Sequence, residues 1–470
     1  MSDVAEFELG ASQTRTITAH GLEAWKEEIW ELTKLSGPVI LTQLSMMAIM
    51  TTDIVMLGHL GVAAIASAAL GNIVFFFTWL FGYGPVCAVA PIIAHILGAR
   101  PKEVDDVRSA VRMGLWSVVI IAPFQIVFLL MARHVLLFFG QNPVLAQGAG
   151  IFTSALAFGL PFSLAYQVLR NFATALKRPL AAMIVMMITI LYNGVADYAL
   201  IFGHFGAPKL GILGAGIASA SSYVFSFLAM LIVVELTPTL KQYGIFRQFF
   251  RPHWEHLREI FHLGAPIGLT MMFEAMLFNA SVLVMGRFGV AAVAAHQISL
   301  NPPSITFMVP LGIATAATVR VGHAAGAGDS NGVRRAGFSA MLLAILFMSV
   351  CAIILFAFSH TIAGLYFDAR APENAEAIAL ATVFLRVAAA FQIFDGLQVV
   401  AALSLRGLKD ARMPMVIAGA SYWLAGFPSC LILAFWFGLK GFGVWLGLAF
   451  GLLVAAVLMC WRFYWLARQR

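Results

Sequence analysis

Long stretches of apolar residues recur along the whole chain and are separated by short polar segments. Runs such as Gly37 to Leu57, Val111 to Leu130 and Phe442 to Met459 have the roughly 20-residue length that a helix needs to cross the core of a bilayer. Twelve such stretches occur, which predicts twelve transmembrane helices. Their approximate spans are 36 to 57, 64 to 97, 110 to 138, 149 to 169, 180 to 203, 212 to 236, 263 to 286, 292 to 319, 337 to 366, 377 to 405, 413 to 437 and 442 to 464.

The composition excludes a soluble fold. Of 470 residues, 61% are hydrophobic and only 11% are charged, whereas soluble domains average about half apolar and a quarter charged residues. The four cysteines, Cys87, Cys351, Cys430 and Cys460, lie inside apolar spans at spacings that fit neither a metal site nor a disulfide framework. We therefore interpret them as packing residues.

The formal net charge of +7 is explained by the distribution of Lys and Arg rather than by a nucleic-acid partner. Most of the basic residues fall on one side of the predicted membrane, the side of both termini, as the bias of Lys and Arg toward cytoplasmic loops requires. We expect a multi-pass protein of the inner (plasma) membrane with both termini in the cytoplasm.

The segment before the first span lacks the apolar region of a signal peptide, and Leu22, Trp25, Ile29 and Leu32 share one helical face. This face predicts a short helix lying on the membrane surface.

The chain contains an internal repeat. GHLGVAAIA at 58–66 matches GRFGVAAVA at 286–294, 228 positions later. Further pairs agree with this repeat: Pro38 with Pro266, His95 with His323, Gly98 with Gly326 and, at an offset of 232, Leu176-Lys177 with Leu408-Lys409. Each repeat holds six spans, an even number, so both halves enter the membrane in the same direction, an arrangement known among transporters.

These observations predict an all-α integral membrane protein with twelve transmembrane helices in two pseudo-symmetric six-helix lobes. The expected organisation is a cytoplasmic tail with the interfacial helix at 1–34, a first lobe (helices 1–6) at 35–236, a cytoplasmic linker at 237–262 and a second lobe (helices 7–12) at 263–466.

Acidic residues inside apolar spans are the main candidates for chemistry, because charge at bilayer depth is costly. Asp53 lies 19 positions after Lys34, and Asp197 lies 19 positions after Arg178. The two helices cross the membrane in the same direction, so both carboxylates lie at the same depth in the bilayer. Asn193 precedes Asp197 by four residues and shares its helix face. Two carboxylates and an amide oxygen suit Na⁺, and two close carboxylates also suit a proton carrier.

The second half contains two further acids within spans, Glu274 and Asp395, which we expect to bind a cation or a drug. Met272 and Phe273 beside Glu274 would form an apolar wall for a flat organic cation. His296 and Gln297 would line a pore or form hydrogen bonds between helices. Arg386 lies within the tenth span, where it would either reach outward or pair with an acid.

Several motifs resemble the multidrug and toxic compound extrusion (MATE) family, in particular its NorM-like branch. These motifs cover nearly the whole chain after the tail, in the family's order and spacing: TTDIVMLGHLG around Asp53, MMFEAMLFNASVLVMGRFG around Glu274, AAVAAHQISLN at 291–301, RVGHAAGAG at 320–328 and FDGLQVVAALSLRGLKD at 394–410.

The resemblance implies an antiporter that expels cationic or aromatic drugs through a cavity between two lobes. It assigns Asp53, Asn193 and Asp197 to a cation site in the first lobe, and Glu274 and Asp395 to acids of the second. The chain departs from many relatives at His95, where they have Gln. At Phe391, one turn before Asp395, some relatives have Tyr, so this chain lacks a hydroxyl at that candidate cavity position.

We therefore predict a multidrug efflux antiporter that uses Na⁺ or H⁺ as the coupling ion and has no cofactor and no metal other than Na⁺. Its expected partners are small-molecule drugs and the lipid bilayer, and a monomer suffices. The alternative is a flippase for a lipid-linked precursor, which would favour a basic, hydrated groove. An enzyme is not expected, because the sequence contains no HExxH, GxSxG or P-loop pattern.

Overall fold

The chain is almost entirely helical in the part that the computed structural model describes, residues 21–366 and 374–469. The first half contains α2 (Leu22–Gly58), α3 (Val62–Ala99), α4 (Asp105–Leu130), α5 (Ala132–Phe138), α6 (Pro143–Ala175), α7 (Pro179–Phe202), α8 (Ile212–Leu236) and the short α9 (Pro238–Lys241). The second half contains α10 (Trp254–Met285), η1 (Gly286–Phe288), α11 (Val290–Gly326), α12 (Ser330–Ala357), α13 (Ser359–Tyr366), α14 (Ala375–Gly407), α15 (Arg412–Gly419), η3 (Ala420–Gly426), α16 (Phe427–Leu431), η4 (Ile432–Trp436) and α17 (Lys440–Gln469).

Within the described residues, twelve helical segments are long and apolar enough to cross a membrane, in agreement with the predicted number. The eleventh combines α15, η3, α16 and η4, and two of these pieces are π-helical. Successive turns lie at opposite ends of the bundle. We call the end that holds residues 237–253 the linker side, and the opposite end the far side.

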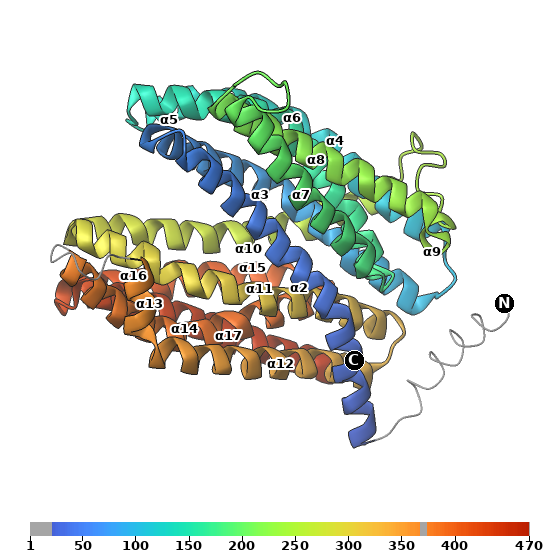
Figure 1. Ribbon diagram of the computed structural model, residues 1–470. Coiled ribbons are helices and arrows are strands. Elements are labelled where there is room, and N and C mark those ends of the chain that lie inside the picture. Colours follow the sequence, from blue (N-terminus) through green and yellow to red (C-terminus); the bar gives the residue numbers. More distant parts are fainter. Residues whose placement is uncertain (1–20, 367–373, 470) are drawn as a thin grey trace.

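The helices form two lobes, α2 to α8 and α10 to α17, seen as the blue-to-green and yellow-to-red groups in Figure 1. Backbone geometry repeats between them. Gly61 and Gly289 immediately precede α3 and α11 with φ of 108° and 102°, and Lys177 and Lys409 follow α6 and α14 with φ of 58° and 60°. Glycine suits the first pair, because side chains rarely adopt this conformation. The repeated conformations agree with the two lobes predicted from the sequence repeat.

The first helix of each lobe packs on both lobes. Leu32 and Leu35 from the linker-side half of α2 belong to the core of the second lobe, whereas Leu57 near its far end packs in the first lobe. The linker-side half of α10 likewise packs against the other lobe, because Leu257 and Ile260 belong to the core of the first lobe. In Figure 1, α2 crosses from one group of helices to the other. The two lobes are thus joined through their linker-side halves.

Small residues allow the lobes to approach closely on the linker side. A Cβ atom on Gly98 of α3 would collide with the carbonyl of His323 in α11, and one on Gly326 would collide with the carbonyl of His95. The two contacts are equivalent positions of the repeat. Close crossing of helix backbones at small residues is typical of membrane proteins, where packing drives helix association.

One prediction needs correction. Residues 22–34 do not form a separate surface helix but are the first part of α2, and residues 1–20 of the predicted tail lie outside the described residues. Three basic residues at or near the ends of predicted spans are buried inside helices: Arg112 in α4, Arg170 in α6 and Arg406 in α14.

Candidate functional site: two clusters of buried acids

The first cluster lies near the far end of the first lobe. Asp53 projects from α2, and Asn193 and Asp197 project from one face of α7, one turn apart. All three are buried, and the Asp53 carboxylate lies close enough to interact with the other two side chains. Ser219 of α8 donates a hydrogen bond from its hydroxyl to Asp53 Oδ2 over 2.8 Å. The structure therefore brings together the three residues that the sequence placed at one depth.

Several polar atoms of this cluster have no hydrogen-bond partner among the described residues. Asp53 Oδ1, both carboxylate oxygens of Asp197 and both side-chain polar atoms of Asn193 are enclosed and have no hydrogen-bond partner among the described residues. Burying two carboxylates without compensation is costly, so the group needs a bound cation or a proton. Its oxygen atoms are the ligands preferred by small hard cations, and its donor set therefore fits Na⁺ as well as H⁺.

The second cluster lies in the second lobe, where Asp395 is buried and Glu274 is partly buried. Glu274 of α10 and Asp395 of α14 interact electrostatically with each other. Gln398, one turn after Asp395, donates from Nε2 to Glu274 Oε1 over 3.4 Å. Asp395 Oδ1 has no hydrogen-bond partner among the described residues. The two acids that the sequence predicted for this lobe thus share one site.

Tyr422 is a member of the second cluster that the sequence did not reveal. It lies in the π-helical segment η3, is fully buried and is in electrostatic range of both Glu274 and Asp395. Its hydroxyl has no partner among the described residues. π-Helical turns are frequent at functional sites. Tyr422 supplies a hydroxyl to the cluster from another helix, although Phe391 lacks one.

Most of the weaker cavity candidates do not belong to either cluster. His296 and Phe391 are buried in the core of the second lobe, where both rings pack edge-on against Trp445. His296 Nε2 lies 3.2 Å from the hydroxyl of Ser281 on α10, which agrees with the predicted hydrogen bond between helices. A cavity role for His296 and Phe391 stays a prediction. Gln297 of α11 is exposed.

The remaining two candidates flank Glu274 on α10. Met272 and Phe273 are partly buried, and the Phe273 carbonyl accepts a hydrogen bond from Trp423 Nε1 over 3.3 Å. Their role in a cavity stays a prediction. Arg386 is exposed on α14, where it donates to the hydroxyl of Ser359 and lies over the ring of Phe356.

Polar groups on the linker side are of two kinds. A buried ion pair joins the lobes: Arg320 of α11 donates from Nε and Nη2 to the two carboxylate oxygens of Glu28 in α2, over 2.8 and 2.6 Å. Their side chains are 11% and 7% exposed.

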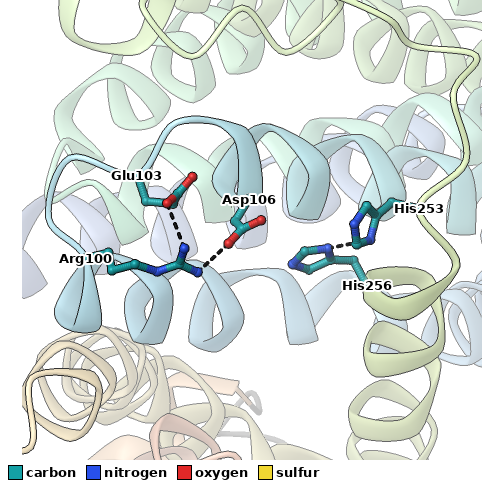
Figure 2. A network of polar contacts seen from close by, with 5 residues as sticks. All are labelled: Arg100, Glu103, Asp106, His253 and His256. Carbon is teal, nitrogen blue, oxygen red and sulfur yellow. Dashed lines mark hydrogen bonds and ion pairs between the residues drawn. The ribbon is translucent and has the colours of Figure 1, made fainter.

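Figure 2 shows the second kind, a more exposed network at the same end of the bundle. Arg100 binds Asp106 and, over 2.9 Å, Glu103. Nearby, the Nδ1 atoms of His253 and His256 are 2.9 Å apart. This network belongs to loop and helix ends and lies away from both acid clusters.

Comparisons with known proteins agree on one family. A sequence model of the MatE family matches residues 38–199 and 266–432, one match in each lobe. The chain is 42% identical over 448 residues to a probable multidrug resistance protein NorM from Mesorhizobium japonicum, covering 95% of both chains. It is 41% identical to a protein of the same name from Brucella suis, covering 93% of both.

Solved structures share the fold. The eukaryotic MATE transporter AtDTX14 aligns with a TM-score of 0.83 at 23% identity, covering 95% of this chain and 98% of that one. An outward-facing MATE family transporter of the MOP superfamily also aligns with a TM-score of 0.83, at 19% identity, covering 94% of this chain and 96% of that one. Both similarities extend over the two lobes.

Proposed function

The chain belongs to the MATE family of membrane transporters, and on that premise we propose that it is a cation-coupled antiporter. It exports cationic and aromatic compounds while Na⁺ or H⁺ enters. Relatives that cover almost the whole chain are named as probable multidrug resistance proteins, which supports multidrug efflux as the function. It works as a monomer in the inner membrane, with the linker side and both termini in the cytoplasm, consistent with the excess of Lys and Arg there.

The buried carboxylate pair of the first lobe carries this proposal. Asp53 and Asp197 are enclosed in an apolar bundle with unsatisfied oxygen atoms, and a charged pair of this kind is stable only when a cation or a proton neutralises it. A site that must be filled by a positive charge suits an inward cation gradient as the energy source. Na⁺ and H⁺ satisfy the same oxygen atoms, so both are candidates.

An open apolar groove runs along α2 and α7 of the first lobe. It has a volume of about 440 Å³ and is lined by residues that include Thr52 and Gly194, and Leu191 in its wall is largely exposed. Thr52 adjoins Asp53 in sequence, and Gly194 adjoins Asn193. The groove offers a place for the organic substrate on the helices that carry the ion site, so that a shift of α2 and α7 on cation binding would couple the cation to the drug.

The way in which the lobes are joined supports alternating access as the mechanism. The lobes meet through the linker-side halves of α2, α3, α10 and α11, and the contacts at Gly98 and Gly326 belong to this closed end. Opening toward the cytoplasm requires these contacts and the Glu28–Arg320 pair to break. Rocking of one repeat against the other around a site between them is a known mechanism of transporters.

Efflux of ethidium from proteoliposomes tests this function. An imposed inward cation gradient should drive efflux by the wild type, and Asp53→Asn should abolish it while leaving expression and fold intact, because the substitution conserves shape. Asp105→Asn, the same change at an acid of α4 whose side chain is 83% exposed, serves as the matched control. Full efflux by Asp53→Asn would refute the first-lobe ion site, and the absence of wild-type efflux under any gradient would favour a flippase instead.

A further inference from the structure

A second apolar groove lies on the first lobe and shares no residue with either acid cluster. It has a volume of about 350 Å³ and is lined by residues of α4, α6, α8 and the linker (residues 237–253). Val119 of α4 and Phe162 of α6 in its wall are exposed, so the groove opens at the surface of the bundle. Phe162 also packs against Phe227 of α8, with ring centroids 5.8 Å apart. Because these helices span the membrane, the open side of the groove faces lipid chains.

The groove has the length of one leaflet of a bilayer. Its wall on α4 extends from Leu115 to Ile126, which is about 16 Å of helix, and half of the hydrocarbon core of a bilayer is about 15 Å thick. Leu115 lies at the end that the linker covers. Arg247 and Arg251 of the linker are exposed there, as is typical of the headgroup region. The groove therefore spans the leaflet on the linker side.

Side chains of α4 hold the linker over this end of the groove. Arg112 donates from Nη1 to the Gln248 carbonyl over 2.8 Å. Trp116, one turn further along, donates from Nε1 to the Phe249 carbonyl over 2.9 Å and stacks on the Phe249 ring, which lies in the wall of the groove. The backbone N–H of Arg251 binds the same Gln248 carbonyl as Arg112, over 2.9 Å. These contacts place Arg112 and Arg251 together at the headgroup end of the groove.

The charges of these two arginines are not compensated by the protein. Neither forms an ion pair within residues 21–366 and 374–469. Arg112 is 6% exposed, and its Nε atom is enclosed without a hydrogen-bond partner in the same part of the chain. Asp105 and Asp106, the two acids of α4, pair with other arginines. A buried charge without a counter-charge is costly, so this position favours an anion.

We infer that the groove binds an anionic phospholipid of the linker-side leaflet. One acyl chain lies between α4, α6 and α8, and the phosphate group contacts Arg112 and Arg251. Guanidinium groups bind phosphate through charge-assisted hydrogen bonds, and basic residues next to a membrane attract acidic lipids. Phe250 and Trp254 are largely exposed on both sides of Arg251, as is typical of residues at the membrane interface. The site is independent of the proposed export function, because it uses neither acid cluster.

Native mass spectrometry of the purified protein with dioleoyl phosphatidylglycerol and dioleoyl phosphatidylcholine tests this inference, because the two lipids share their chains and differ in headgroup charge. The wild type should bind the first phosphatidylglycerol at least about tenfold more tightly than phosphatidylcholine, since each arginine contributes about fivefold. Arg112→Gln and Arg251→Gln should each lower this preference about fivefold. Val119→Trp, which fills the groove, should weaken the binding of both lipids by a similar factor.

Controls separate a ligand role from a structural one. Arg334→Gln removes an exposed arginine at the linker-side end of α12 and should keep the wild-type preference, and Arg112→Lys, which retains the charge, should keep most of it. If Arg112→Gln proves unstable, Arg251→Gln still carries the test, because Arg251 is exposed. Equal binding of the two lipids by the wild type, or an unchanged preference in both Gln variants, would overturn the inference.

An excess of inorganic phosphate distinguishes a lipid from a free anion. A lipid site predicts that phosphate leaves the binding of phosphatidylglycerol unchanged within about twofold, because burial of the acyl chain contributes a large part of the affinity. If phosphate displaces phosphatidylglycerol, and Val119→Trp binds this lipid as the wild type does, the arginines hold a free anion and the lipid assignment is wrong.

Discussion

Breaking the Glu28–Arg320 ion pair should open the linker side of the transporter. The pair joins α2 to α11 through two hydrogen bonds of 2.8 and 2.6 Å. Removing one partner of a buried pair costs about 3 to 5 kcal/mol. The lower end applies to Glu28→Gln, because the amide can still hydrogen bond and the charges of Glu27 and Glu31 also act on Arg320. About 3 kcal/mol corresponds to a shift of roughly 100-fold toward the open state.

Thiol labelling reports this shift. Ala94 is fully buried on α3 and faces Gly322 of the other lobe, so Ala94→Cys, in a background without the native cysteines, reacts with maleimide only when the linker side opens. Glu28→Gln should raise the labelling rate up to about 100-fold. The matched control is Glu103→Gln, since its partner Arg100 is 60% exposed and exposed pairs contribute at most about 1 kcal/mol.

A charge reversal completes the test. Glu28→Arg combined with Arg320→Glu restores the attraction and should bring labelling back toward the wild-type rate, whereas each single reversal should raise it. If Glu28→Gln labels at the same rate as Glu103→Gln, the ion pair does not hold the linker side closed and the reasoning is wrong.

Three further predictions concern single positions. Gly98→Ala should slow transport at least tenfold and increase thiol labelling at position 94, because its Cβ collides with the carbonyl of His323 when the linker side is closed. Ser219→Ala should weaken activation of efflux by the coupling cation about ten- to 150-fold, because one lost hydrogen bond to a charged group is worth about 1.5 to 3 kcal/mol. The change is seen as a higher half-saturating cation concentration with an unchanged maximal rate. Tyr422→Phe should reduce efflux, because it removes a hydroxyl group from the second cluster. It should leave thermal stability unchanged or higher, because that hydroxyl is buried without a partner among the described residues. A normal efflux rate would exclude a function of this hydroxyl in transport.

The sequence predicted the features that depend on periodicity and depth. Apolar runs of bilayer length identified twelve spans, and the repeat identified the equivalent positions of the two lobes. Asp53 and Asp197 could be placed together because their equal distances from basic flanking residues fix their depth in the membrane. Asn193 could be added because it precedes Asp197 by four residues and therefore lies on the same helix face. These arguments use only helix geometry.

Features that depend on packing between helices could not be predicted. Ser219 and Tyr422 are polar residues in apolar spans, and their role depends on which way α8 and η3 face, which a repeat does not reveal. Arg170 and Arg406 resemble loop residues in the sequence because they lie near helix ends, yet packing of the lobes buries them. The packing of α2 and α10 against both lobes likewise depends on tertiary contacts, which the sequence does not reveal.

Ethidium efflux by wild type and Asp197→Asn in proteoliposomes, measured first under an inward Na⁺ gradient and then under an inward H⁺ gradient, tests the coupling claim most directly. We predict that one of the gradients drives efflux by the wild type and that neither drives efflux by Asp197→Asn. The effective gradient then identifies the coupling ion. Gradient-driven efflux by Asp197→Asn at the wild-type rate would contradict the claim that the first-lobe carboxylates couple cation entry to drug export.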